Sequence, residues 1–139
     1  MKIKKLNPDV IMPTKGTRYA GAFDIYMPEA GKITGAHTIY GLGFAAEIPE
    51  NHVALILPRS GVGSKFGVEL NNTCGVIDAD YRGEWKVSIR TKSNQPFCWE
   101  KGDRLFQFLV VPVANVTLEE VDDLPESKRG TGGFGSTGQ

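Results

Sequence analysis

Apolar and polar residues alternate along much of this chain in short stretches, and this pattern predicts β-strands. Residues 84–91 are the clearest case, with Trp85, Val87 and Ile89 on one face and polar side chains between them, as expected of a strand with one buried face. Residues 105–113 form a nearly unbroken apolar run, which is typical of a central strand. No stretch of ten or more residues has the period of a helix. The chain is therefore expected to be all-β: a sandwich, a jelly roll or a closed barrel.

Further strands are expected wherever β-forming residues lie between turns rich in Gly, Pro, Asn or Asp. They are residues 2–6, 24–27, 38–48, 52–57, 67–70 and 116–118. Because only the turn 49–51 separates 38–48 from 52–57, these two strands are expected to pair as a hairpin. Residues 59–66 interrupt the strand pattern with two glycines and predict a short helical turn.

Residues 71–85, NNTCGVIDADYRGEW, concentrate polar chemistry between two predicted strands. The apolar run 74–77 stops at Asp78 and a strand pattern resumes at Trp85, which predicts a β-hairpin with a charged tip. Loops held by a rigid scaffold are where functional side chains gather. Asp78 and Asp80 could be metal ligands, a general base with a structural partner, or turn formers, and turn formers are the default in isolation.

Three other features admit both a functional and a structural interpretation. Residues 58–61, PRSG, could bind phosphate through an Arg fork, a Ser hydroxyl and backbone amides, or form an ordinary polar loop. Gln107 lies inside the apolar run, where a buried amide needs hydrogen-bond partners. Asp103 and Arg104 are expected to form an ion pair where this strand begins. His37 and His52 have no nearby acid or nucleophile, so both are expected to be surface or strand positions.

The last segment differs in composition from the rest. Residues 127–139 are rich in glycine and follow the acidic stretch 119–126, so the chain is expected to divide into a β core, 1–126, and a flexible tail, 127–139. Such a tail cannot bury enough surface to fold alone, but its amides and hydroxyls could order around a phosphate. Its Gly-x-Gly-x-x-Gly spacing lacks the strand and helix that a dinucleotide site needs.

Composition narrows the expected partners. The chain has 139 residues with 16 Lys plus Arg and 16 Asp plus Glu, so a surface for nucleic acid is not expected. No apolar run approaches the roughly 18 residues of a membrane span, and the start has no apolar signal region. A soluble cytoplasmic protein is expected. Cys74 and Cys98 lie in apolar surroundings and are expected to be buried free thiols, as suits a reducing compartment.

Five short stretches form one pattern along the chain: AGAFDIY at 20–26, PRSGVGSKFGV at 58–68, NTCGVIDADYRGE at 72–84, GDRLFQF at 102–108 and RGTGGFGSTG at 129–138. Together they resemble the motifs of the homotrimeric dUTP pyrophosphatases (dUTPases). The resemblance implies a jelly-roll-like β-barrel or sandwich that hydrolyses dUTP to dUMP and diphosphate. Two positions depart from the family's pattern: Ala22 stands where glycine is usual, and Phe106 where a smaller apolar residue is common.

The resemblance also implies residue roles. Asp78 and Gln107 would hold the attacking water, and Tyr81 would pack under the deoxyribose and exclude a 2′-hydroxyl. The uracil edge would be read by Asn72 and by backbone groups of Gly75, Val76 and Ile77. The phosphates would be bound by Arg59, Ser60 and Gly61 and covered by Arg129, Gly133, Ser136 and Thr137, while Phe134 stacks on the base. Asp24, Asp80, Asp103 and Arg104 would have supporting roles, Asp80 by pairing with Arg104 or Arg82.

The family resemblance implies a Mg²⁺ ion bound by the triphosphate and waters, with no direct protein ligand, and a homotrimer whose sites draw motifs from three subunits. Two alternatives stay open at this point. One is a dCTP deaminase of the same fold, including bifunctional forms. The other is a nucleotide-gated regulator of a protein partner.

Overall fold

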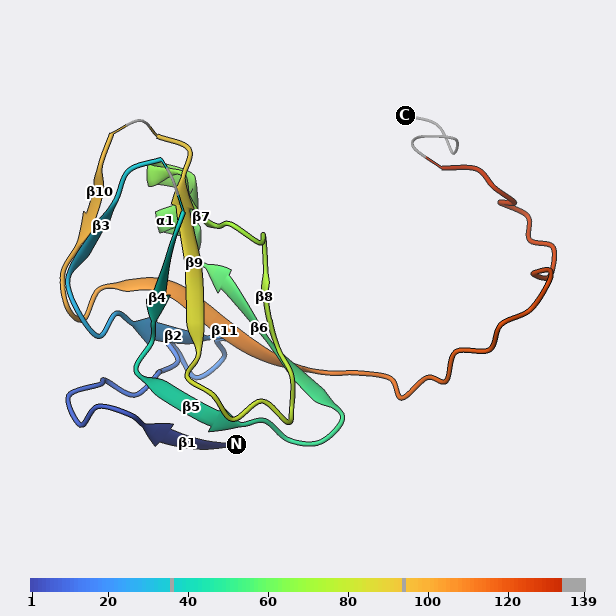
Figure 1. Ribbon diagram of the computed structural model, residues 1–139, viewed down its shortest axis with the longest axis horizontal. Helices are drawn as coiled ribbons and strands as arrows, with labels where there is room; N and C mark the ends of the chain where they lie inside the picture. The colour runs from blue at the N-terminus through green and yellow to red at the C-terminus, as the bar shows by residue number, and fades with distance from the viewer. Residues whose placement is uncertain (36, 94, 134–139) are drawn as a thin grey trace.

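Short antiparallel strands make up nearly all of the regular structure. The computed structural model describes residues 1–35, 37–93 and 95–133, and Figure 1 shows its ribbon. The elements are β1 (Lys2–Lys5), β2 (Phe23–Tyr26), β3 (Gly31–Ile33), β4 (Thr38–Gly41), β5 (Phe44–Glu47), β6 (His52–Pro58), α1 (Ser60–Phe66), β7 (Val68–Leu70), β8 (Gly75–Ile77), β9 (Lys86–Thr91), β10 (Phe97–Trp99) and β11 (Arg104–Pro112). The expected all-β class and the short helical turn are confirmed.

The strands form four separate sheets. The largest has the order β2-β11-β6-β8, the second β4-β9-β7, and two pairs, β1-β5 and β10-β3, complete the set. Every strand pairing among them is antiparallel. The arrangement is a jelly-roll-like sandwich, as expected, and the closed barrel in that expectation is wrong. The long run 105–113 is a central strand, because β11 pairs with β2 on one side and β6 on the other.

Aromatic side chains join the sheets in the core. Trp85 is fully buried, and its ring centroid lies 5.2 Å from that of Phe44 and 5.1 Å from that of Phe108. These rings connect the entrance to β9 with β5 and β11. The alternation predicted for 84–91 is confirmed, since Val87 and Ile89 are buried beside Trp85 while Lys86 and Arg90 are exposed. Phe106, one of the two departures, is also fully buried.

Both predicted hairpins are wrong. Residues 38–48 divide into β4 and β5 at Gly43, whose φ of 72° favours glycine. β5 then pairs with β1, whereas β6 pairs with β11 and β8. Residues 71–85 cross between two sheets, because β8 pairs with β6 and β9 pairs with β4 and β7. A pattern of burial predicts strands well but does not say which strand will be the neighbour.

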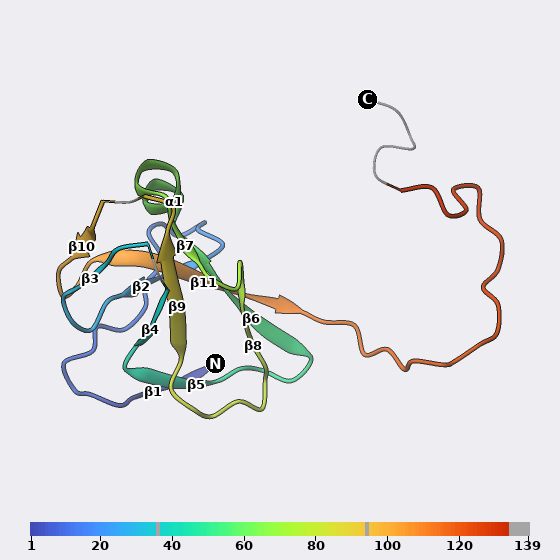
Figure 2. The same cartoon turned by 45° about the horizontal axis from the view of Figure 1, so that its top comes forward.

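The chain after β11 contains no strand in its described part, residues 113–133, so the strand expected at 116–118 is wrong. Val116 and Leu118 are 72% and 93% exposed, and Figures 1 and 2 show this segment running away from the sheets. Cysteine burial was overestimated as well, because Cys74 is half-buried and Cys98 is exposed. Within the described residues, no helix is long and apolar enough to cross a membrane.

Candidate functional site

A buried carboxylate holds two arginines at one end of the largest sheet. Asp24 on β2 has a side chain only 11% exposed, and its Oδ1 lies 2.9 Å from Nε of Arg59. Its Oδ2 accepts a hydrogen bond from Nη1 of Arg104 at 3.2 Å. Arg59 also donates from Nη1 to the backbone oxygen of Arg104 at 3.1 Å. One negative and two positive charges leave this cluster with a net charge of about +1, which suits an anionic ligand.

Gln107 lies beside the same cluster. It is directly opposite Asp24 in the β2–β11 register, and its Nε2 donates to the backbone oxygen of Pro58 at 3.3 Å. Pro58 is the last residue of β6, so the amide side chain lies against the start of the 58–61 loop. In that loop Ser60 and Gly61 are exposed, and a Cβ added at Gly61 would meet nothing within 4 Å. The first, second and fourth motifs therefore meet in one place.

The 71–85 segment forms a second polar group. Asn72 donates from Nδ2 to the backbone oxygen of Cys74 at 3.0 Å, which fixes the entrance to β8. Gly75 is close to β6, because a Cβ added there would lie 3.1 Å from Cβ of Ile56. Among the described residues, β8 is the outermost strand of its sheet and pairs only with β6, so its other edge has no neighbouring strand, and Val76 is 60% exposed. Its backbone groups on that edge are accessible to a ligand.

Tyr81 and Asp78 follow β8 and are both exposed. The Tyr81 hydroxyl donates to the backbone oxygen of Glu84 at 3.0 Å, and the Tyr81 amide donates to the backbone oxygen of Asp78 at 3.2 Å. The phenol ring is thereby tied to the turn that carries Asp78. An added Cβ at Gly83 would overlap this ring, so the tight turn requires glycine.

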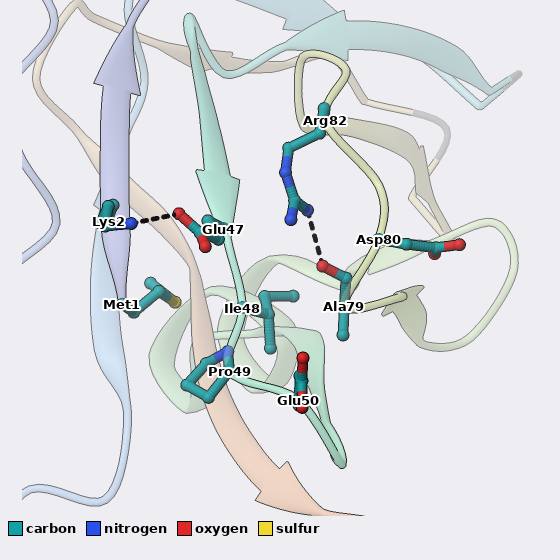
Figure 3. A pocket seen from close by; sticks show the side chains of 9 residues that line it. All are labelled: Met1, Lys2, Glu47, Ile48, Pro49, Glu50, Ala79, Asp80 and Arg82. Atoms are coloured by element: carbon teal, nitrogen blue, oxygen red, sulfur yellow. Dashed lines mark hydrogen bonds and ion pairs between the residues drawn. The ribbon is translucent and has the colours of Figure 1, made fainter.

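Two of the expected ion pairs are wrong. Asp80 makes no ion pair within 4.0 Å with any described residue; Arg104 pairs with Asp24 instead. Arg82 donates to backbone oxygens, of Ala79 at 2.6 Å and of Tyr81 at 3.3 Å. Figure 3 shows the Asp80 carboxylate pointing away from the Arg82 guanidinium, at the edge of a pocket that the start of β1 also lines.

Asp103 does not pair with Arg104 either. Its carboxylate accepts a hydrogen bond from the backbone amide of Glu100 at 2.9 Å, which closes the turn before β11. The Asp103 side chain therefore stabilises a turn, whereas the Arg104 side chain belongs to the Asp24 cluster. Neighbouring residues at the start of a strand point to opposite faces, which separates them.

The two polar groups lie far apart within one chain. In β6, Leu57 is opposite Gln107, whereas Ala54 is opposite Ile77. Asp78 is therefore level with Val53, four residues from Leu57, on the other side of β6 from Gln107. At about 3.3 Å per residue and about 4.8 Å between strands, the Gln107 and Asp78 backbones are separated by roughly 15 Å. One water cannot contact both side chains of the same chain.

The described part of the tail places Arg129 in a local turn. Its Nε donates to the backbone oxygen of Gly132 at 2.8 Å, and the amide of Gly130 donates to the Ser127 hydroxyl at 3.1 Å. Nothing would meet an added Cβ at Gly133 within 4 Å. The expected contacts of Phe134, Ser136 and Thr137 lie outside the described residues.

Sequence reasoning missed the residues that anchor the 71–85 segment. Glu84 accepts a hydrogen bond at Oε1 from the backbone amide of Gly43 at 3.0 Å, and its carboxylate fills the space where a Cβ at Gly41 would be. The glycines on either side of Leu42 were the available signal, because paired glycines in a strand often mark a close approach by another group.

Acidic and histidine side chains do not gather into a metal site here. Among residues 1–35, 37–93 and 95–133, no group of three or more His, Cys, Asp or Glu side chains is placed to hold a metal ion. Asp78 and Asp80 are both exposed.

Comparisons with known proteins agree with the motif pattern. The dUTPase family model matches residues 9–138. A deoxyuridine 5′-triphosphate nucleotidohydrolase of Nautilia profundicola is 41% identical over 140 residues, which cover 100% of this chain and 99% of the relative. One from Dictyoglomus turgidum is 39% identical, over 98% of this chain and 96% of the relative. The chain belongs to the dUTPase family.

A solved structure of the same family has a closely similar fold. A variant of the Staphylococcus bacteriophage 80alpha dUTPase, determined with dUpNHpp, is 26% identical and superposes with a TM-score of 0.91, covering 99% of this chain and 98% of the phage chain. The match extends over nearly the whole length of both chains.

Proposed function

We propose that this protein hydrolyses dUTP to dUMP and diphosphate, and that each active site is completed by more than one copy of the chain. The observation that carries the proposal is that four of the five motifs form two separated groups: the first, second and fourth motifs meet around Asp24, Arg59 and Gln107, and the third is the 71–85 segment. Each group is well formed, yet roughly 15 Å lies between Gln107 and Asp78 in one chain. In a cyclic trimer, the first group of one copy can face the second group of its neighbour.

Asp78 is the proposed general base. It orients a water molecule and accepts its proton as the water oxygen bonds to the α-phosphorus. The bond from that phosphorus to the oxygen bridging the α- and β-phosphates then breaks, and diphosphate leaves. Gln107 of a neighbouring copy would hold the same water through its amide. Assistance of this kind is typically worth about 10² to 10⁴ in rate.

The arginine cluster is the proposed phosphate site. Asp24 fixes the guanidinium of Arg59 at 2.9 Å in a defined orientation, so little side-chain entropy is lost when a phosphate binds. Ser60 and Gly61 offer a hydroxyl and backbone amides on the exposed side of the same loop. Arg104 supplies the second positive charge that prevents Asp24 from neutralising the site.

The 71–85 segment is the proposed nucleoside site. Backbone groups of Gly75, Val76 and Ile77, with Asn72 supporting their entrance, would read the uracil edge. Tyr81 would lie against the deoxyribose, where a 2′-hydroxyl would collide with the ring. Selection by a site that leaves no room for an extra group favours dUTP over UTP. Asp80 and Asp103 belong to the supporting turns.

The tail, residues 127–139, is proposed to be a separate unit that closes over bound nucleotide. Its described part makes only local hydrogen bonds, so it is free to exchange them for phosphate oxygens. Arg129 and the amide of Gly133 would contact the outer phosphates with Ser136 and Thr137, and Phe134 would stack on the base. Closure would exclude water that is not positioned for attack.

Magnesium is the proposed cofactor. A variant of the phage phi11 dUTPase of S. aureus, 22% identical with a TM-score of 0.80, has been described with a structural Mg(II) ion. In this chain the ion would arrive on the triphosphate, because magnesium prefers phosphate oxygens and retained waters as ligands. Such an ion would neutralise phosphate charge. Removing divalent ions with EDTA should therefore abolish turnover without unfolding the protein.

Hydrolysis is favoured over the two alternatives. The relatives compared above are nucleotidohydrolases by name, which favours diphosphate release over deamination. A purely regulatory role would not require the catalytic carboxylate at 78. The test is a direct assay of diphosphate from dUTP, with Asp78→Asn as the matched variant and dCTP, UTP and dTTP as competitors. Turnover that survives Asp78→Asn, or ammonia release from dCTP, would contradict the proposal.

A further inference from the structure

Glu84 joins two parts of the fold that no assigned role connects. Its Oε1 accepts the backbone amide of Gly43 at 3.0 Å, in the turn between β4 and β5. Its backbone oxygen accepts the Tyr81 hydroxyl at 3.0 Å. The same residue therefore holds the phenol of the proposed nucleoside site on one side and a turn of a neighbouring sheet on the other.

Backbone hydrogen bonds reinforce this connection. The amide of Trp85 donates to the oxygen of Phe44 at 2.9 Å, and the amide of Leu42 donates to the oxygen of Trp85 at 2.9 Å. Trp85 itself is fully buried. The residue after Glu84 is thus held in the core by both of its backbone groups, and Glu84 lies between it and the exposed Tyr81 and Arg82.

Glycines on both sides make room for the contact. A Cβ at Gly41 would overlap the Glu84 carboxylate, and a Cβ at Gly83 would overlap the Tyr81 ring. Gly43 has a φ of 72°, which aims its amide at the carboxylate without strain. Three glycines thus allow a polar side chain, an aromatic ring and a turn to pack together.

We infer that Glu84 is a positioning residue for sugar selection: it fixes the Tyr81 ring through the β4–β5 turn and thereby sets the preference for dUTP over UTP. The inference rests on the proposed function, because it assigns to Glu84 the placement of the group that tests the sugar. The proposed function gives Glu84 no contact with the substrate or with the attacking water. A looser Tyr81 would tolerate a 2′-hydroxyl by shifting, while the carboxylate of Asp78 would remain in place.

The main test compares kcat/KM for dUTP and UTP in the full-length protein and in Glu84→Ala. Loss of one partly buried hydrogen bond costs about 0.5–1.5 kcal/mol, so the dUTP:UTP ratio should fall by up to about 10-fold. The fall should come mainly from better use of UTP, with kcat for dUTP changed less. Glu84→Gln retains an acceptor for the Gly43 amide and should restore most of the ratio.

Gly41→Ala tests the same contact without removing the carboxylate. Its Cβ would displace Glu84, and the backbone at Gly41 does not have the positive φ that requires glycine. The dUTP:UTP ratio of kcat/KM should fall as in Glu84→Ala, and it should fall no further in the double variant that carries both Gly41→Ala and Glu84→Ala. Glu84 lines a cleft of about 400 Å³, which gives the displaced side chain room.

Glu69→Ala is the matched control. Glu69 is also a half-buried carboxylate, but it lies in β7 and its partners are Arg90 of β9 and Lys92, which directly follows β9. The Glu69→Ala variant should lose some stability and keep the wild-type dUTP:UTP ratio of kcat/KM. An unchanged ratio in both Glu84→Ala and Gly41→Ala, with dUTP still hydrolysed by the wild type, would overturn the inference alone. A wild type that fails to hydrolyse dUTP would overturn the proposed function and the inference with it.

Discussion

Replacing Asp24 should weaken both the fold and nucleotide binding. In Asp24→Asn, two guanidinium groups lose the carboxylate that lies 2.9 Å from one and 3.2 Å from the other. Removing one partner from a fully buried pair costs about 3–5 kcal/mol. The Arg59 and Arg104 side chains are 34% and 43% exposed, so solvent screening lowers the expected loss to about 1–3 kcal/mol.

The expected loss corresponds to a fall in Tm of about 3–12 °C for a chain of this size. Nucleotide affinity should fall as well, because Arg59 would no longer be held toward the phosphates. Charge-assisted hydrogen bonds contribute about 1.5–3 kcal/mol, so KM for dUTP should rise by roughly 10-fold or more. Thermal unfolding and steady-state kinetics on the same preparation measure both effects.

The chain offers a matched control in Glu69→Gln. This carboxylate also bridges two cations, Arg90 at 2.7 Å and Lys92 at 3.2 Å, but its side chain is 26% exposed against 11% for Asp24. Glu69→Gln should lower the free energy of unfolding by no more than about 1 kcal/mol and leave KM for dUTP unchanged. If Asp24→Asn behaved like this control in both Tm and KM, the interpretation of the arginine cluster as a pre-formed phosphate site would be refuted.

Three further outcomes are expected. Deleting residues 129–139 should lower kcat for dUTP by at least about 10-fold with little change in Tm, since the described part of that tail packs on nothing; an unchanged kcat would contradict tail closure. The hydrogen bond and charge of Lys2 lower the pKa of Glu47 from its ordinary value of 4.5. The ion pair therefore stabilises the fold above that pH, and this stabilisation is lost as the pH falls through the lowered pKa. Lys2→Ala should therefore raise that pKa in an NMR titration, and no change would contradict the ion pair. Trp85→Phe should lower the free energy of unfolding by less than the roughly 3–5 kcal/mol of a large-to-small change in a core. The reason is that it also removes a buried Nε1–H that lacks a partner among the described residues. A larger fall in the free energy of unfolding would show that this N–H is satisfied.

Burial patterns predicted much of the strand content. The strands at residues 84–91 and 105–113 could be predicted from local sequence alone, because alternating apolar residues indicate a half-buried strand and a continuous apolar run indicates a central strand. The partners of these strands could not be predicted. Residues 38–48 and 52–57 are adjacent in sequence, yet the left-handed turn at Gly43 sends β5 to β1, and β6 joins the largest sheet instead.

β propensity alone also failed at residues 116–118. Val116 and Leu118 favour strands, but no described strand lies beside them, and an isolated strand leaves its backbone groups unpaired. Apolar side chains that are 72% and 93% exposed are costly in a lone chain. The β propensity of residues 116–118 produces a strand only where a neighbouring strand pairs with their backbone groups.

The candidate site was predictable in its residue types but not in its arrangement. The motifs identified Asp24, Arg59 and Gln107 as members of one site, and the structure brings these three together. The pairing of Asp24 with Arg104, eighty residues away, could not be read from local spacing, and Asp80 was assigned a partner that it does not have. The Glu84 contact depends on space left by glycines in another strand, which no single stretch of sequence reveals.

The most direct test of the shared site mixes two inactive chains. Asp78→Asn and Arg59→Ala should each abolish most dUTP hydrolysis on their own. Co-expressed in equal amounts, they should recover about a quarter of wild-type activity, because each mixed cyclic trimer has one interface where an intact Asp78 faces an intact Arg59. Activity no higher than that of the separate variants would show that each chain builds its own site and would contradict this account.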